Sequence, residues 1–438
     1  MDIIIAGAGR VGFRLAKVLS AKHNVTIMDK NTEALNKIQE RIDVLTVPGN
    51  VQDPDSYEAL RGREVDLFIA VTDVDEVNLV SSIIADEKIR VKRKIIRLRN
   101  EFFARSSIAE KIAITDAVFP YSLTAASVRA LLDYPKANNV KGFPETPMKL
   151  VSVRANFHHA AHTVPLEQIN SKRVMVVGID RKKDFHIPGA NDAIRQDDMV
   201  YLFGDDEAIR ELCGRFDHKM PRRIRKIVIL GADTLGVEIA KALSVHSATI
   251  KLIEKDLGKC RRAAEILQGN ATVINSKYGD FRLYRDEGLA NAEMLIASTA
   301  NDEENIIKCI EAKEHGIEKV VAINNDLEYY NLMHSLGLVI VRGPKTNAFY
   351  SIMETIGSST AVNEKLFCGG AAICFVRDLN GYRGTIRPLL RHNVLSCIIS
   401  ADALRLFDAP AEVEERSVVM SFCSRCREDE VRRWINEL

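Results

Sequence analysis

The chain has 438 residues, 46% hydrophobic and 28% charged, which is the composition of an ordinary globular protein with room for two to four domains. Lys plus Arg number 61 against 60 for Asp plus Glu, so a formal charge of +1 favours neither nucleic acid nor an anionic membrane as partner. No stretch approaches the ~18 to 20 apolar residues of a membrane span, and the N-terminus lacks the basic region of a signal peptide. We therefore expect a cytoplasmic protein with eight reduced cysteines, and any membrane role would pass through a partner.

Residues 1–31, MDIIIAGAGRVGFRLAKVLSAKHNVTIMDKN, contain a GxGxxG turn between an apolar strand and a helical pattern. Gly7 permits the tight turn, Gly9 lets the backbone approach a pyrophosphate, and Gly12 lets the helix pack on the sheet. The helix N-terminus adds amide donors and a positive dipole end. The pattern predicts phosphate binding, and Arg10 inside the loop either joins the phosphate contacts or is a solvated surface residue.

An acidic residue closes the next apolar run. Asp29 lies 22 positions after Gly7, where the ribose hydroxyls of a dinucleotide are expected. A carboxylate there repels a 2'-phosphate, so NAD or an adenine nucleotide is favoured over NADP. The alternative is a structural turn that has lost its ligand.

Strand and helix patterns alternate through the rest of the first part. Strands are expected at 2–7, 24–29, 43–50, 65–72 and 93–100, and helices at 10–22, 32–41, 55–61 and 76–88. This alternation predicts a doubly wound parallel sheet that binds its ligand at the carboxyl ends of the strands.

The pattern occurs twice. IRKIVILGADTLG at 224–236 repeats the first turn, and IKLIEKD places Glu254 where Asp29 stood. A second pair of segments, LFIAVTDVDEVN and MLIASTANDEEN, also aligns. Four polar positions are shared: Thr72 with Thr299, Asp75 with Asp302, Glu76 with Glu303, and Asn78 with Asn305. An acidic cap at a helix start is the simpler explanation of the acidic pairs.

The second copy departs from the first at the turn. Asp233 replaces the middle glycine, which brings a side chain and a negative charge to the point of closest phosphate approach. The segment from Gly279 to Glu293 is also shorter than its counterpart, Gly49 to Asp66. We predict that the second site is degenerate and mainly structural.

A smaller unit follows each of these domains. Pro, Gly and Asn residues at 138–147 mark the first boundary, and short strands ending in a helix indicate a small α+β domain. A basic segment at 219–226, KMPRRIRK, is expected to be a solvated connector rather than a phosphate patch. The expected domains are 1–140, 145–218, 224–360 and 365–438.

These motifs together carry a family resemblance. The chain resembles the TrkA family in VT..DE.N at a strand end, in FPYSLTAASVRALL, VGIDR and IPGAND...QDDMVYLFG, and in the repeat of the dinucleotide unit that follows them. Members are cytosolic subunits of bacterial Trk potassium uptake systems built from tandem RCK (regulator of potassium conductance) domains. From about Gly369 to Leu438 the family pattern is missing, so the last lobe is divergent.

The resemblance implies two Rossmann-like doubly wound α/β domains, each followed by a small α+β lobe. It implies a non-enzymatic regulatory subunit that binds NAD(H) or ATP/ADP and forms a ring, taken as a tetramer. The ring would gate a TrkH-like membrane potassium-channel subunit at the inner face of the membrane, with no role for nucleic acid.

The resemblance also implies ligand-binding residues in the first domain. The glycines and Arg10 would hold phosphates, Asp29 the ribose, and Asn50 would lie near the adenine, while the two arginines would reach phosphate in a ring neighbour. The full set is Gly7, Gly9, Arg10, Val11, Gly12, Asp29, Lys30, Asn50, Thr72, Asp75, Glu76, Arg97 and Arg99.

Two other motifs were weighed as metal or redox sites. His158 and His162 of HHAAH could share a helical face, but the segment continues a strand and lacks a third ligand, so an exposed polar loop around His159 is favoured. Cys423 and Cys426 form a CxxC without a second pair, which indicates neither zinc nor redox chemistry. No metal is expected.

Two rival functions stay open. An NAD-dependent oxidoreductase with tandem Rossmann domains would need a His or Lys placed beside the nicotinamide, and no motif supplies one. A scaffold that binds nothing is disfavoured by the intact first turn. Turnover distinguishes the first two, because a sensor binds NADH and leaves it unchanged.

Overall fold

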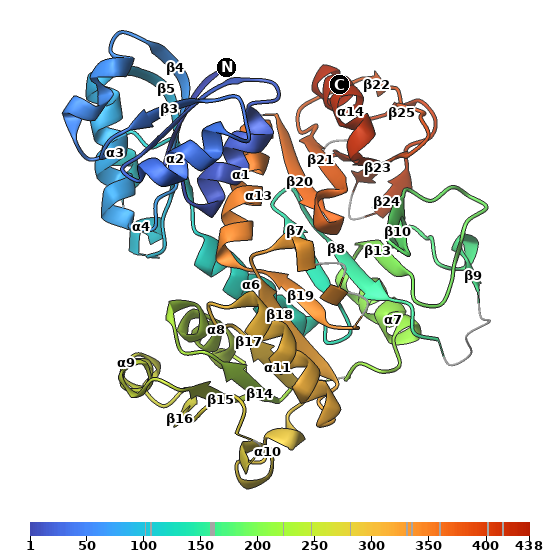
Figure 1. The fold of residues 1–438 in the computed structure, drawn as a ribbon. Coiled ribbons are helices and arrows are strands. Elements are labelled where there is room, and N and C mark those ends of the chain that lie inside the picture. The colour runs from blue at the N-terminus through green and yellow to red at the C-terminus, as the bar shows by residue number, and fades with distance from the viewer. Residues whose placement is uncertain are drawn as a thin grey trace. The chain divides into compact units, whose positions relative to one another are not determined.

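The structure is a computed structural model of residues 1–438. It describes the chain except residues 101, 106, 158–162, 222, 247, 281, 330–331, 334–335, 359–360, 401–402 and 414–415. Four lobes follow one another along the chain, named here the first α/β lobe, the first small lobe, the second α/β lobe and the second small lobe (Figure 1).

The first α/β lobe is built on a parallel sheet of order β3-β2-β1-β4-β5-β6. Its strands are β1 Asp2–Ala6, β2 Asn24–Asp29, β3 Leu45–Pro48, β4 Glu64–Ala70, β5 Arg90–Arg97 and β6 Asp116–Val118. The strand centres are continuous runs of buried Ile, Val, Leu and Phe, because helices cover both faces of such a sheet. This order brings the ends of β1 and β4 together at the point where the winding reverses, which is where ligands bind in this architecture.

The helices of this lobe begin close to where the sequence predicts. They are α1 Arg10–Leu19, α2 Thr32–Gln39, α3 Asp75–Lys88, α4 Phe102–Arg105, α5 Ile108–Lys111 and α6 Pro120–Asp133. The helix expected at 55–61 is instead a 3₁₀ helix, Pro54–Leu60, whose N-cap Asp53 accepts from the amide of Asp55. Proline near its start suits that short, tight helix.

The first small lobe is an antiparallel sheet of order β11-β10-β13-β8-β7, with helix α7 after the last strand. Its elements are β7 Asn139–Phe143, β8 Thr146–Arg154, β9 Val164–Pro165, β10 Val174–Arg181, β11 Asp184–His186, β12 Ala193–Ile194, β13 Met199–Gly204 and α7 Asp206–Phe216. Strands β9 and β12 form a separate two-stranded ribbon. A single 3₁₀ turn, Leu166–Gln168, follows β9.

The second α/β lobe repeats the first, with sheet order β16-β15-β14-β17-β18-β19. Its strands are β14 Lys226–Leu230, β15 Thr249–Glu254, β16 Thr272–Asn275, β17 Met294–Ala297, β18 Lys319–Asn324 and β19 Val339–Arg342. Its helices are α8 Thr234–Ser244, α9 Leu257–Leu267, α10 Arg282–Asp286, α11 Asp302–Glu314 and α13 Pro344–Gly357. The repeat confirms the predicted pair of Rossmann-like sheets, each followed by a small α+β lobe.

The second small lobe has the topology of the first although its sequence pattern is divergent. Its elements are β20 Val362–Phe367, β21 Ala372–Asp378, β22 Thr385–Ile386, β23 Val394–Ser400, β24 Ala403–Leu406, β25 Ala411–Glu412, β26 Val418–Ser424 and α14 Glu428–Glu437. The sheet order β20-β21-β26-β23-β24 matches β7-β8-β13-β10-β11 strand for strand. The two small lobes share one core, in which the Phe203 ring lies 5.2 Å from that of Phe422.

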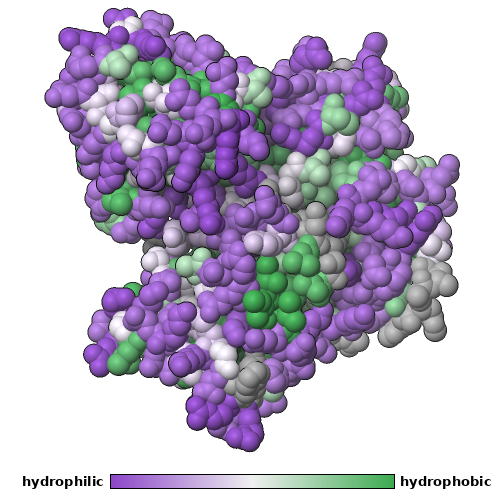
Figure 2. Space-filling model, in the orientation of Figure 1, coloured by the Kyte–Doolittle hydropathy of each residue, from purple (hydrophilic) through white to green (hydrophobic). Residues whose placement is uncertain are grey.

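Contacts between residues divide the chain into two compact units. Helix α13 lies in the second half of the sequence but belongs to the same unit as the first α/β lobe. The first unit is Met1–Thr124 with Arg342–Ile356, and the second is Ala125–Val341 with Gly357–Leu438. In the described part of the chain no helix is long and apolar enough to cross a membrane. The face shown in Figure 2 is mostly hydrophilic.

Candidate functional site

The first glycine turn lies between β1 and α1, at the carboxyl end of the sheet. Gly7 has a φ of +114°, a conformation that a side chain strains. A Cβ on Gly12 would lie 1.8 Å from the carbonyl oxygen of Gly7, so only glycine lets α1 pack against the turn. At Gly9 a Cβ would meet nothing within 4 Å, which leaves that side of the turn open to a ligand.

Helix α1 starts without a side-chain cap. Its N-cap residue is Gly9, and no acidic residue lies in the first turn. The first amides of the helix, including those of Arg10 and Val11, therefore point at the open side of the turn with the positive end of the helix dipole. An anionic group such as a phosphate satisfies both features.

Asp29 is held at the end of β2 by the backbone of the turn. Its Oδ2 accepts from the amide of Ala8 at 2.6 Å and its Oδ1 from the amide of Asn31 at 2.8 Å. The side chain remains half-buried, and a carboxylate oxygen accepts more than one hydrogen bond. The carboxylate is thus oriented beside the turn with capacity left for hydroxyl donors, as ribose binding requires.

The other predicted residues on this side are exposed and less constrained. Lys30 follows Asp29 directly and is exposed. Asn50 is exposed after β3, and its Oδ1 accepts from the amide of Gln52 at 3.1 Å, which fixes the loop.

A buried amide organises the opposite side of the site. Asn78 Oδ1 accepts from the Thr72 amide at 2.9 Å and from the Thr72 hydroxyl at 2.7 Å. Asn78 Nδ2 donates to the Arg97 carbonyl at 2.8 Å. This fully buried side chain ties the end of β4 to the end of β5.

The two acidic residues at the start of α3 differ in role. Asp75 is buried and accepts from the amides of Arg99 and Asn100, each at 2.9 Å, so its carboxylate braces the end of β5. Glu76 is exposed in the first turn of the helix. The geometry therefore makes Asp75 a positioning residue for the cluster beside it.

Asp73 gathers both predicted arginines, and sequence reasoning missed it. Its Oδ1 lies 3.0 Å from Arg97 Nη1 and 2.8 Å from Arg99 Nη2. Burial raises the pKa of Asp73, but the charges and hydrogen bonds of the two guanidinium groups outweigh it and leave the pKa below its ordinary value. Among the described atoms, Nε of Arg97 and Nε of Arg99 are buried without a hydrogen-bond partner. The position of Asp73 directly after Thr72, at the end of a strand, was the sequence signal that could have identified it.

The second glycine turn has the same backbone but is filled by its own side chains. Gly231 has a φ of +99°. Asp233 pairs with Lys259 at 2.6 Å, at the position where the first turn is open. Glu254 is 2% exposed and accepts from the Tyr278 hydroxyl at 2.9 Å. Among the described residues, Asp29 accepts from the amides of Ala8 and Asn31 and from no hydroxyl.

The strand-end network recurs in the second lobe without its charges. Asn305 Oδ1 accepts from the Thr299 amide at 2.9 Å, as Asn78 does from Thr72. The residues at the positions of Asp73, Arg97 and Arg99 are Ala300, Ile323 and Asn325, because Asn305 donates to the Ile323 carbonyl as Asn78 does to that of Arg97, and Asp302 accepts from the Asn325 amide as Asp75 does from that of Arg99. The repeat thus preserves the structural hydrogen bonds and changes the residues that would face an anion.

Motifs outside the site carry no metal geometry. Among the described residues, no three His, Cys, Asp or Glu side chains gather as a metal site requires. Cys423 is buried and Cys426 is exposed. His158, His159 and His162 lie outside the described residues.

The fold and the turn together define a class of proteins with tandem dinucleotide-type α/β lobes. The sequence model of the TrkA-N domain matches residues 3–120 and 227–343, together more than half of the chain. The chain therefore belongs to the TrkA-N domain family, and the resemblance to TrkA is confirmed.

Curated relatives align over most of this chain. It is 28% identical over 366 residues to the Trk system potassium uptake protein trkA homolog 1 of Methanosarcina mazei, covering 81% of this chain and 89% of that protein. It is 27% identical over 400 residues to the Trk system potassium uptake protein TrkA of Vibrio alginolyticus, covering 89% and 87%.

Solved structures share the fold at low sequence identity. The crystal structure of the GsuK RCK domain aligns with a TM-score of 0.65 at 15% identity, covering 100% of this chain and 95% of that one. The GsuK channel bound to NAD aligns with a TM-score of 0.64 at 14% identity, covering 100% and 79%.

Proposed function

We propose that this chain is a regulatory subunit of a potassium transport system and binds NAD(H) or an adenine nucleotide at the first glycine turn. The observation that carries the proposal is the contrast between the two turns: the first is open with an oriented Asp29, and the second is filled by Asp233 and Tyr278. Relatives covering most of the chain are named Trk system potassium uptake proteins.

The first turn supplies the two interactions that a nucleotide needs. The uncapped amides of α1 and the open side at Gly9 receive the phosphates, and Asp29 accepts from the ribose hydroxyls. In this proposal Thr72 and Glu76 would border the ligand, and the exposed Asn50 and Lys30 would lie at the rim of the site. Arg97 and Arg99, held by Asp73, provide guanidinium groups for an additional phosphate.

In the second turn the same ligand would face repulsion and competition. The Asp233 carboxylate stands where the phosphates would come closest, and Glu254 is occupied by Tyr278. The second glycine turn therefore acts as a structural copy, leaving the first as the only one of the two turns that binds nucleotide.

A membrane partner follows from this role. A potassium channel or transporter subunit, taken as TrkH-like, would be gated by a ring of these chains, taken as a tetramer, at the cytoplasmic face of the membrane. The nucleotide biases the ring only by its differential affinity for two ring conformations, and a tenfold ratio per site is about 1.4 kcal/mol.

We propose that the chain is not an enzyme. A dehydrogenase places an acid or base beside the nicotinamide, whereas the carboxylates of Asp29 and Asp75 accept from backbone amides and that of Asp73 pairs with two arginines.

Calorimetric titration of the full chain with NADH, NAD, ATP and ADP tests the proposal, with the absorbance of NADH followed in the same samples. We expect one binding site per chain at the first turn and unchanged NADH. Gly9→Asp should abolish binding at the first turn, and Lys37→Gln, at an exposed position of α2, is the control that should keep it. Binding that survives Gly9→Asp and is lost on changing Glu254 would refute the assignment, and oxidation of NADH would favour the dehydrogenase.

Potassium flux tests the coupling to a membrane partner. Proteoliposomes with a Trk-type membrane subunit should show nucleotide-dependent flux with the wild-type chain and nucleotide-independent flux with Gly9→Asp. Equal nucleotide dependence with both chains would contradict gating through the first turn.

A further inference from the structure

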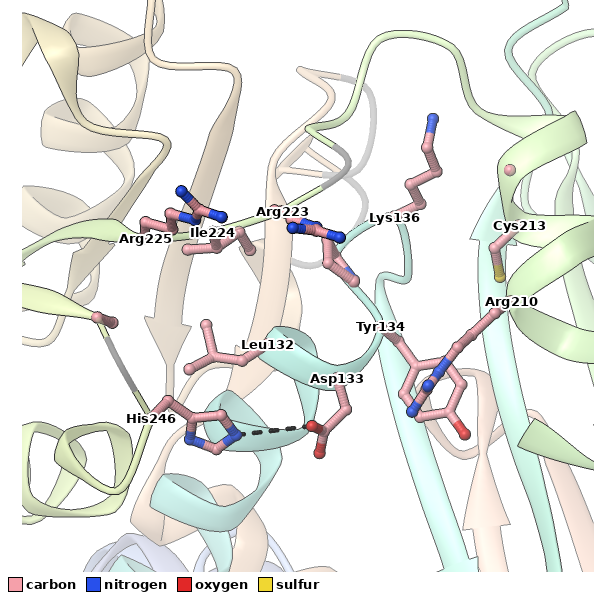
Figure 3. A pocket seen from close by; sticks show the side chains of 13 residues that line it. Leu132, Asp133, Tyr134, Lys136, Arg210, Cys213, Arg223, Ile224, Arg225 and His246 are labelled. Atoms are coloured by element: carbon pink, nitrogen blue, oxygen red, sulfur yellow. Dashed lines mark ion pairs between the residues drawn. The ribbon is translucent and has the colours of Figure 1, made fainter. Parts of the chain in front are cut away.

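A cavity lies away from the second glycine turn. Its volume is about 820 Å³, and its walls are the end of α6, helix α7, the linker at 223–225 and the loop between α8 and β15 (Figure 3). Strands β14 and β15 begin beside it at Lys226 and Thr249. The cavity is therefore at the amino edge of the second sheet, opposite the edge that carries the Gly231 turn.

Three guanidinium groups line this cavity, those of Arg210, Arg223 and Arg225. Among the described residues, none of the three forms an ion pair with a carboxylate, although the chain has nearly equal numbers of acidic and basic residues. Arg210 also lies over the Tyr134 ring, with its Cζ 5.1 Å from the ring centroid. Three like charges around one cavity raise its potential and attract an anion. Guanidinium is also the group best suited to bidentate contacts with phosphate.

The one carboxylate in the cavity wall, that of Asp133, offsets the charge of one of the three arginines and leaves the wall positive. Asp133 Oδ1 lies 3.6 Å from His246 Nε2, the pair drawn dashed in Figure 3. His246 Nδ1 is buried and has no hydrogen-bond partner among the described residues. Lys136 is already used, because its ammonium donates to the carbonyl of Asp217.

The remaining wall is apolar. Leu132, Pro135, Ile224 and Ala248 line it, and ligand pockets are lined predominantly by such apolar side chains. An inorganic phosphate would use the arginines and leave these residues in contact with water. A nucleotide would place its phosphates against the arginines and its flat base against the apolar residues. The cavity volume is within the ordinary range for such ligands.

We propose that this cavity is a second anion site that binds a nucleoside polyphosphate. Its phosphates contact Arg210, Arg223 and Arg225, and its base lies against Leu132 and Ile224. Because the walls come from the first small lobe, the linker and the second α/β lobe, a bound ligand joins the two halves of the chain. The basic linker, expected from sequence to be a solvated connector, becomes part of a site.

The test uses the full chain carrying Gly9→Asp, so that the first turn no longer binds nucleotide. Titration with ATP at low ionic strength is expected to show one site per chain, weakening as salt is added. Substituting Arg210, Arg223 and Arg225 by Gln should lower the affinity at least about tenfold. A control with the same loss of charge substitutes the exposed Arg41, Arg261 and Arg262 by Gln and should keep the affinity.

A second variant fills the cavity without changing its charge. Gly214 lines the cavity, and a Cβ there would meet nothing within 4 Å, so Gly214→Leu fits the helix and occupies the ligand's space. It should abolish ATP binding while the thermal unfolding temperature is kept. Inorganic triphosphate should bind more weakly than ATP, because it cannot use the apolar wall.

Three results would overturn the proposal: no ATP binding by the Gly9→Asp chain, equal losses in the cavity and control variants, or unchanged affinity in Gly214→Leu. None of them depends on whether wild-type protein binds nucleotide at the first turn, so failure of this site and failure of the proposed function are separate outcomes.

Discussion

Alanine substitutions at Asp29 and Glu254 should have opposite consequences. The two carboxylates occupy equivalent positions, and each accepts from two backbone amides. Asp29 is half-buried beside an open turn, whereas Glu254 is 2% exposed and also accepts from the Tyr278 hydroxyl. Asp29→Ala should therefore remove nucleotide binding, and Glu254→Ala should mainly reduce stability.

The magnitudes follow from the hydrogen bonds lost. Two ribose hydroxyl bonds to a carboxylate contribute roughly 1.5–3 kcal/mol each, so Asp29→Ala should weaken nucleotide binding by a factor of about 10² to 10⁴. Glu254→Ala leaves the buried Tyr278 hydroxyl without an acceptor, which costs about 1–3 kcal/mol in addition to the lost amide contacts. The double variant Glu254→Ala with Tyr278→Phe should recover part of that loss.

Titration calorimetry with the preferred nucleotide measures the first effect, and urea unfolding of the same proteins measures the second. The reasoning is refuted if Glu254→Ala reduces nucleotide affinity as much as Asp29→Ala does. It is also refuted if the double variant is less stable than the single one, because Tyr278 would then have a role other than filling the site.

Three further predictions concern the turn, a buried lysine and helix α13. Gly12→Ala should lower the free energy of unfolding by more than about 3 kcal/mol, because its Cβ would lie 1.8 Å from a carbonyl oxygen of the turn. Gly9→Ala should keep the unfolding temperature measured by calorimetry and weaken only nucleotide binding, because a Cβ there meets nothing within 4 Å. Burial lowers the pKa of Lys319 to about 7, so above about pH 7 the unfolded chain binds the proton that the native state has released. Stability should therefore rise towards about pH 9 by up to ~1.4 kcal/mol per pH unit, and urea unfolding of Lys319→Met should lack this rise; a parallel pH profile would contradict it. Arg14→Gln removes a cation 4.0 Å above the Phe349 ring and should cost about 0.5–2 kcal/mol, seen as faster hydrogen exchange in α13; unchanged exchange would count against the contact.

The periodic parts of the chain were predictable from sequence. Strands β1 and β2 and helix α1 follow from apolar runs and the glycine turn, because a parallel sheet covered on both faces is built from continuous apolar strands. The replacement of the middle glycine by Asp233 could be read directly from the sequence. The assignment of ligand roles to individual residues stays a prediction.

Contacts between distant residues were not predictable in this way. Asp73 meets Arg97 and Arg99 only because the parallel sheet places the ends of β4 and β5 side by side. Tyr278 reaches Glu254 from an irregular segment without periodicity. The last lobe keeps its topology after its motifs have changed, because a sheet needs only alternating apolar residues and turns.

Helix α1 connects the glycine turn to a helix that the second half of the chain contributes. Its Arg14 lies one turn beyond the phosphate-facing end and places its guanidinium over Phe349 of α13. Asn347 of α13 also donates to the Thr124 hydroxyl at 2.8 Å, within the same compact unit. A ligand that favours one position of α1 therefore acts on contacts that hold α13, and α13 continues along the chain towards β20, which begins at Val362. The second turn, already filled by Asp233 and Tyr278, has no comparable ligand-dependent energy to contribute, so of the two turns only the first is expected to transmit nucleotide binding.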